Sequence, residues 1–73
     1  MNWSANIILR SSKSVFIKHI TSIIKIGVSG QPETITDFSS FVLSSSLRLS
    51  FIGKENIVTL FSSDIEYIEF TIG

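Results

Sequence analysis

Apolar and polar residues alternate along most of this 73-residue chain. The clearest run has an apolar residue at every second position, namely Trp3, Ala5, Ile7 and Leu9. Successive side chains of a β-strand point to opposite faces of the sheet, so such a run is typical of a strand with one buried face. Ile8 interrupts the alternation. Because the same period of two recurs in both halves of the chain, the sequence predicts an all-β fold.

Short polar segments divide the alternating runs into six expected strands. The strands are predicted over residues 3–10, 15–20, 23–28, 41–52, 57–61 and 66–72. Between them we expect a turn at 11–14, a corner at 21–22, a hairpin loop at 53–56 and a second corner at 62–64. Residues 35–39 should form a loop or a single helical turn. Ile35, Phe38 and Phe41 fit one helical face, whereas the β-branched residues around Ile35 disfavour a helix.

These strands would make one domain over residues 1–73. The domain would consist of two three-strand meanders, residues 3–28 and 41–72, joined by a connector at 29–40. A strand content of roughly 60% is high for an average domain but normal for a small barrel, because closure removes exposed strand edges. We therefore expect a small barrel or curled antiparallel sheet of about six strands, of SH3-like or OB-like size.

A short pattern occurs twice in the chain. The two copies are Val15-Phe16 with Ile20-x-x-Ile23 and Leu60-Phe61 with Ile65-x-x-Ile68. Each copy follows a polar turn and another apolar run. We expect one isoleucine of each pair at a corner and the other in the next strand, with both side chains in the core.

Basic and acidic residues are separated along the chain. Residues 1–32 contain four basic residues and no acidic one, namely Arg10, Lys13, Lys18 and Lys25. Residues 33–73 contain all six acidic residues, with Arg48 and Lys54 as the remaining basic ones. The charges could pair across strands of one chain, for example Glu66 or Glu69 with Lys18 or Lys25, or act between chains. Because the formal net charge is zero, nucleic-acid binding is disfavoured.

The chain is apolar for its size. Hydrophobic residues make up 44% of it and charged residues 16%, whereas about 25% charged residues is usual. A domain this short buries only about 60% of the surface of its unfolded chain. Either the sheet packs on itself unusually completely, or part of the apolar surface is covered by another chain. We favour the second, which predicts a homo-oligomer or a protein partner.

No residue pattern indicates catalysis, a metal or a cofactor. The chain has no cysteine, and His19 is its only histidine. A serine triad would need a strand-to-helix turn that the pattern lacks. Glu66 and Glu69 should point to opposite faces of one strand, so they cannot flank a bond together. The Gly27–Gly30 segment is expected to be a plain turn, because no lysine-serine ending of a phosphate loop follows it.

Six residues are candidates for binding: Trp3, Arg10, Lys13, Lys18, His19 and Arg48. Trp3 either anchors a partner or begins the first strand and covers one end of the core. His19 is either a ligand or a residue at the rim of the fold. The four cations would form a phosphate-binding patch if the first strands of the two meanders lay side by side, and would otherwise be separate solvated charges.

The sequence thus predicts a non-catalytic domain that acts by binding. The leading hypothesis is a protein-interaction or inhibitory module that self-associates. The alternative is a domain that holds an anionic metabolite or nucleotide at a subunit interface, and single-stranded nucleic-acid binding comes third. Because no apolar run approaches the roughly 20 residues of a membrane span and no secretion signal is evident, we expect a cytoplasmic protein without a membrane partner.

Overall fold

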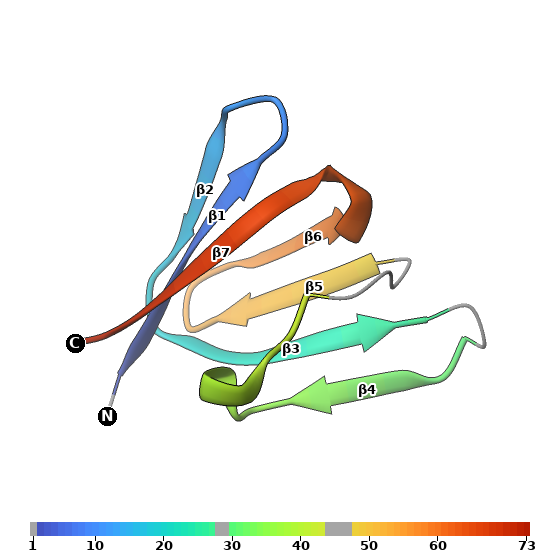
Figure 1. The fold of residues 1–73 in the computed structure, drawn as a ribbon. Coiled ribbons are helices and arrows are strands. Elements are labelled where there is room, and N and C mark those ends of the chain that lie inside the picture. The colour runs from blue at the N-terminus through green and yellow to red at the C-terminus, as the bar shows by residue number, and fades with distance from the viewer. Residues whose placement is uncertain (1, 28–29, 44–47) are drawn as a thin grey trace.

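The computed structural model describes residues 2–27, 30–43 and 48–73, which fold into seven strands and two short 3-10 helices (Figure 1). The strands are β1 (Trp3–Leu9), β2 (Ser14–Ile17), β3 (Ile20–Ile26), β4 (Pro32–Ile35), β5 (Arg48–Gly53), β6 (Ile57–Phe61) and β7 (Ile65–Ile72). The helices are η1 (Phe38–Ser40) and η2 (Ser62–Asp64). No helix in this part of the chain is long and apolar enough to cross a membrane.

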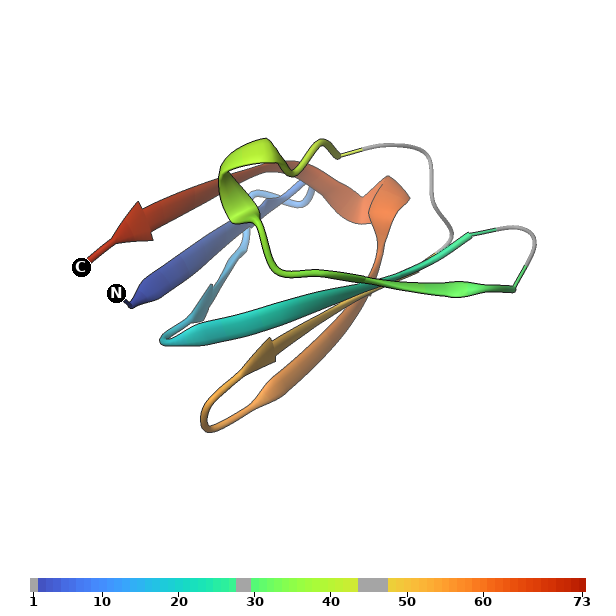
Figure 2. The same cartoon turned by 90° about the horizontal axis from the view of Figure 1, so that it is seen from below.

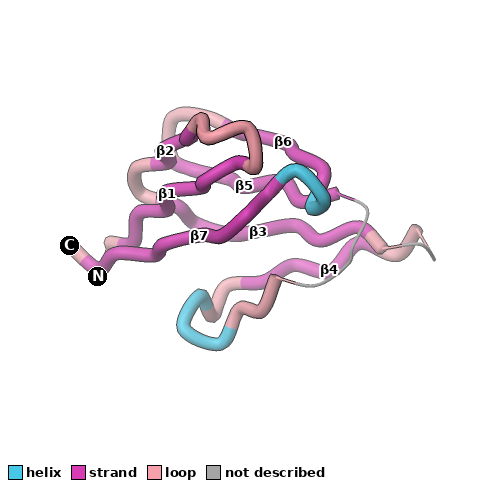
Figure 3. Tube along the Cα trace, turned by 45° about the horizontal axis from the view of Figure 1, so that its top comes forward, coloured by secondary structure: helices cyan, strands magenta, loops and turns pink. Residues whose placement is uncertain are grey.

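The strands form two antiparallel sheets that face each other (Figures 1 and 2). One has three strands in the order β2-β1-β7, and the other has four in the order β4-β3-β5-β6. The all-β prediction is confirmed, and strands dominate the trace (Figure 3). The predicted closed barrel is wrong, because the two sheets remain separate, and so is the count of six strands.

The predicted meanders fail at the third strand of each. β3 pairs with β4 and β5 rather than with β2, and β7 pairs with β1 rather than with β6. The chain changes sheet at two corners, after β2 and at η2. The second corner lies at the predicted residues 62–64. The first lies at Lys18 and His19, before the predicted position, and His19 adopts a left-handed conformation with φ 55° where the chain passes to the other sheet.

The predicted connector contains the seventh strand, β4. Pro32 begins it, and proline is tolerated in this place because β4 is an edge strand. The predicted strand over 41–52 is wrong at its start, since Phe41–Leu43 is not a strand and β5 begins at Arg48. Residues 44–47, and residue 28 at the end of the predicted third strand, lie outside the described residues. The loop or helical turn expected over 35–39 is present in part, because η1 covers Phe38–Ser40 while Ile35 ends β4.

The core lies between the two sheets. Its fully buried side chains are Ala5, Ile7, Ile17, Ile23, Leu49, Phe51 and Ile65. They come from the inward-facing positions of β1, β2, β3, β5 and β7, so both sheets contribute. The alternation predicted for the first strand is present, because Ala5 and Ile7 are buried and Trp3 and Leu9 pack against the core.

Both Ile-x-x-Ile segments begin a strand and contain a β-bulge. In β3 the bulge leaves Thr21 as an extra residue, since Ile20 pairs with Gly53 and Ser22 with Ile52. In β7 the extra residue is Glu66. A bulge places two residues opposite one, so isoleucines three positions apart can face the same way. Ile20, Ile23 and Ile65 are buried and Ile68 is half-buried against the core.

Candidate binding surfaces

The outer face of the four-stranded sheet is apolar. Leu49 and Phe51 of β5 point into the core, so the residues between and after them point outward. Ser50 lies opposite both Ile24 of β3 and Thr59 of β6, and the Ser50 and Thr59 hydroxyls are hydrogen-bonded at 2.9 Å on this outer side. We define the apolar outer face as Ile24, Ile26, Ile52, Ile57 and Phe61.

The apolar outer face is most exposed along β6. Ile57 is 66% exposed and Phe61 58% exposed. Ile57 lies opposite Ile52, and Phe61 lies opposite Arg48, which in turn lies opposite Ile26. Among the described outward-facing residues of β3, β4, β5 and β6, Arg48 is the only charged one. A binding surface of this kind suits an apolar partner.

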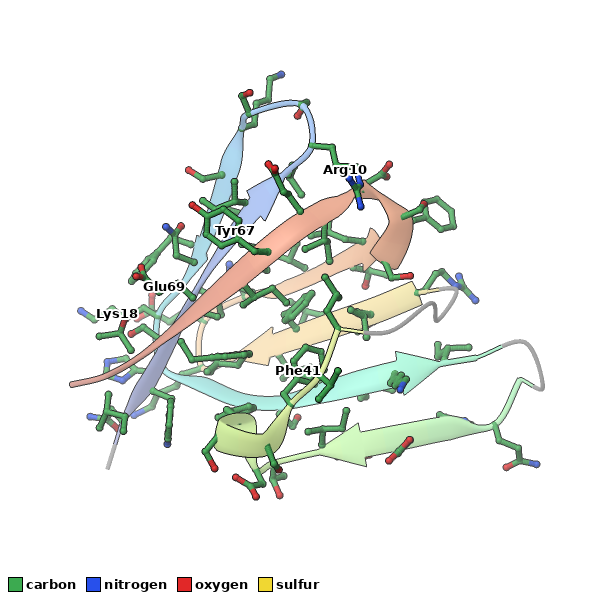
Figure 4. All side chains as sticks on the ribbon, in the orientation of Figure 1. Arg10, Lys18, Phe41, Tyr67 and Glu69 are labelled. Carbon is green, nitrogen blue, oxygen red and sulfur yellow. The ribbon has the colours of Figure 1, made fainter. Side chains whose placement is uncertain are left out.

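The outer face of the three-stranded sheet is of mixed character. Phe16 and Tyr67 are exposed there, but Asn6 lies between Phe16 and the acidic Glu69, and Tyr67 lies opposite Ile8. Figure 4 shows Glu69 and Lys18 on the same side of this sheet. The charge and the amide interrupt the apolar side chains, so this face offers a partner less continuous apolar surface than the apolar outer face.

A cleft of about 600 Å³ opens where the start of β1 meets the first corner. Its lining residues are Asn2, Trp3, His19, Ile20, Thr21, Thr36, Phe38 and Lys54. The Lys54 backbone N–H donates a hydrogen bond to the His19 carbonyl at 3.1 Å, which ties the β5–β6 hairpin loop to the corner. The Trp3 ring packs edge-on to Phe38 with centroids 5.8 Å apart.

The lining of the cleft suits a small anion with a flat apolar part. Lys54 contributes an ammonium group, His19 an imidazole, and Trp3 an aromatic ring. No acidic residue is among the described residues that line the cleft. Cavities of about 300–1,000 Å³ are usual for small ligands. Sequence reasoning missed Lys54, because only the fold brings this hairpin residue next to His19.

The structure places two of the six candidate residues, Trp3 and His19, in this cleft. Trp3 is half-buried and begins β1, which agrees with the interpretation that it covers one end of the core. His19 belongs to the corner rather than to a strand. His19 is half-buried, and its backbone carbonyl accepts a hydrogen bond from the Lys54 N–H. This backbone contact holds His19 at the cleft.

The four cations do not come together as one patch. Arg10 is held at η2, where its Nε donates to the Ser63 carbonyl at 2.9 Å (Figure 4). Lys13 is exposed in the loop between β1 and β2, and Lys18 is exposed at the first corner. Arg48 begins β5 in the other sheet. The condition for a patch fails because β1 and β5 lie in different sheets.

Asp37 organises the short helix η1 beside the cleft. The hydroxyls of Ser39 and Ser40 donate to its two carboxylate oxygens at 2.6 and 2.9 Å. These bonds, that from Ser39 first, hold the pKa of Asp37 below its usual value of 3.8 because they stabilise the ionised carboxylate. The Asp37 carboxylate is therefore occupied within the chain.

The described ranges contain no group of three His, Asp or Glu side chains close enough to hold a metal ion. The apolar outer face and the cleft are thus two candidate binding surfaces formed by the described residues. Comparison of the chain with protein-family models, with curated proteins and with solved structures gave no match.

Proposed function

We propose that this protein is a non-catalytic protein-interaction module that self-associates and uses the apolar outer face as its contact surface. One observation carries the proposal. Five large apolar side chains share the outside of a sheet on which Arg48 is the only charged residue described. A group of large apolar side chains on one outer face of a small domain supports an interaction site.

The expected assembly is weak and depends on concentration. Full burial of an exposed isoleucine or phenylalanine contributes about 1.5–3 kcal/mol, but Ile24, Ile26 and Ile52 are already half-buried. Association itself costs about 4–15 kcal/mol in lost translational and rotational freedom. Because the gain and the cost are of similar size, we expect a weak dimer that dissociates on dilution.

Sedimentation velocity over a dilution series tests this proposal. The wild type should change from monomer to dimer as its concentration rises into the micromolar range. Ile52→Thr, which removes apolar area from the apolar outer face beside Ile57 but keeps a β-branched residue, should shift the transition to higher concentration. Ile8→Thr is the matched control, because Ile8 is a half-buried aliphatic residue on the outer face of the other sheet. A wild type that stays monomeric throughout would contradict the proposal.

A second candidate function is the binding of a small organic anion in the cleft. The observation that favours it is the meeting of Lys54, His19 and Trp3 around a space without described acidic residues. A ring of the ligand would pack on the Trp3 indole, and its anionic group would lie beside the Lys54 ammonium. The ligand would be held by one chain, not at a subunit interface.

The intrinsic fluorescence of Trp3 tests the second candidate directly, because Trp3 is the only tryptophan in the chain. Adenosine monophosphate should alter this emission in a saturable way with a dissociation constant below about 1 mM, corresponding to about −4 kcal/mol. Lys54→Gln should weaken the binding, whereas Lys13→Gln, at an exposed lysine outside the cleft, should not. A response to adenosine equal to that of its monophosphate would reject the anion site.

A further inference from the structure

The two sheets have four edge strands, and three of them are protected. β4 begins with Pro32 and Glu33. β7 contains Glu66 and Glu69, and Phe41 packs edge-on against its Phe70 with centroids 5.9 Å apart. β2 has only four residues and is flanked by Lys13 and Lys18. Proline, charge and short length are the usual means by which proteins prevent edge pairing.

The fourth edge strand, β6, has none of these protections. Its five residues, Ile57 to Phe61, include no charged residue, no proline and no glycine. Its sequence is isoleucine, valine, threonine, leucine and phenylalanine, four of which favour strands. An uncharged apolar edge strand is a site at which another strand can add to the sheet.

The backbone of β6 directs its free groups outward at alternate residues. The Gly53 N–H donates to the Asn56 carbonyl at 2.8 Å, which makes these two residues a hydrogen-bonded pair. Hydrogen-bonded pairs alternate along an antiparallel ladder, so Val58 and Leu60 bond to β5. The N–H and C=O groups of Ile57, Thr59 and Phe61 therefore point away from β5, toward the open edge.

From this geometry we infer that β6 pairs antiparallel with β6 of a second copy, about a two-fold axis at Thr59. In this register Thr59 lies opposite Thr59 of the second copy, and Ile57 lies opposite Phe61 of the second copy. All three outward-directed residues then form hydrogen-bonded pairs. The inference rests on the proposed self-association, and it names the open edge of β6, which carries Ile57 and Phe61 of the apolar outer face, as the contact between the two copies.

Other registers pair fewer residues of β6 with β6 of the second copy. An axis at Val58 would place Phe61 opposite Glu55 in the hairpin loop of the second copy. An axis at Leu60 would place Ile57 opposite Ser63 in η2 of the second copy, so each would leave one outward-directed residue of β6 without a strand partner. An axis at Ile57 or at Phe61 would align part of β6 with the hairpin loop or with η2 of the second copy. The Thr59 axis alone pairs the whole strand with itself and places exposed isoleucine beside exposed phenylalanine, which is a favourable cross-strand pair.

Spin labelling tests the register in the full-length protein. Because the chain has no cysteine, Thr59→Cys gives one labelling site, on the exposed outer side of β6. Nitroxides at residue 59 should show strong dipolar broadening at dimer concentrations. Thr34→Cys is the matched control, because Thr34 is exposed on the outer side of β4 at the other edge of the same sheet. Seven strand spacings would separate two labels at residue 34, or roughly 34 Å, so their spectra should stay sharp.

A mixing experiment tests the Ile57–Phe61 pair. Ile57→Lys alone and Phe61→Glu alone should each reduce self-association, because each places a charge opposite an apolar side chain. An equimolar mixture should recover dimers, since one lysine then lies opposite one glutamate and the other pair stays native. Failure of the mixture to associate would overturn the register.

The outcomes separate the inference from the proposed function. A wild-type dimer that Ile52→Thr weakens, without broadening at residue 59, overturns edge pairing and leaves the apolar outer face as the contact. Broadening at residue 34 equal to that at residue 59 also overturns it. A wild type that is monomeric at every concentration overturns the proposed function itself.

Discussion

The ring of Phe38 lies stacked on the ring of Phe70, with centroids 5.5 Å apart and planes at 17°. Phe38 belongs to η1 and Phe70 to β7, so the contact fastens the segment after β4 to the edge of the three-stranded sheet. Trp3 and Phe41 pack edge-on against this pair, Trp3 on Phe38 and Phe41 on Phe70. The four rings close one side of the core.

Removal of the central ring should destabilise the domain. Phe38 is 6% exposed, and Phe→Ala at buried sites costs about 3–5 kcal/mol. Phe38→Ala should therefore lower the free energy of unfolding by that amount in a urea titration, and Phe38→Leu by less. The control is Phe16→Ala, because Phe16 is 60% exposed and should change stability little. Equal losses at both positions would mean that the ring cluster does not hold η1.

Gly53 should not tolerate a side chain. A Cβ at this position would lie 2.7 Å from Cγ2 of Ile17 and 3.2 Å from the Lys18 carbonyl oxygen. Gly53→Ala should destabilise the domain by about 1–3 kcal/mol, because the buried Ile17 and the corner backbone must shift. Gly27→Ala, where nothing lies within 4 Å of the added Cβ, is the control and should unfold at nearly the wild-type denaturant concentration.

The buried isoleucine after the first bulge should matter more than an isoleucine at the C-terminus. Ile23 is fully buried, so Ile23→Ala should cost about 2–5 kcal/mol. A loss of that size can unfold a small domain. Ile23→Val should lower the free energy of unfolding by only about 0.5–1.5 kcal/mol, so this variant should stay folded and can be measured. Ile72→Ala at a 54% exposed position is the control. Thermal unfolding of the three variants should rank Ile23→Ala lowest.

The carboxyl group of Asp37 should titrate below its ordinary range. Its folded pKa is lowered, first by the Ser39 hydroxyl and then by the Ser40 hydroxyl. The stabilisation is therefore present above the ordinary pKa of 3.8 and is lost as the pH falls through the lower folded value. Nuclear magnetic resonance titration should show this low pKa, and Ser39→Ala should raise it. No rise in Ser39→Ala would mean that the hydroxyl does not hold the carboxylate in solution.

Alternation along the chain identified most strands but could not assign them to sheets. The hairpin of β5 and β6 was predictable because a polar loop separates two β-branched runs. Pairing of β1 with β7 joins opposite ends of the chain, and no local pattern encodes it. The register of side chains within a strand is local, whereas the choice of neighbouring strand depends on how the two sheets pack.

Two errors have specific physical causes. Pro32 lies in the predicted connector, yet it begins β4, because an edge strand needs hydrogen bonds on one side only. The predicted strand over 41–52 begins with Phe41 and Leu43, yet both pack against the core, and Phe41 packs edge-on against Phe70. Of the cleft, the sequence indicated Trp3 and His19 but not Lys54.

The bulges at Thr21 and Glu66 have a consequence for changes in chain length. Deletion of either residue would leave every other side chain of its strand on the same face, because the extra residue lies outside the alternation. The strand would lose the added twist and bend that a bulge supplies. Thr21 and Glu66 thus help to set the angle between the two sheets. Deletion of either residue would change the orientation of one sheet relative to the other, although the alternation of apolar and polar side chains would stay the same.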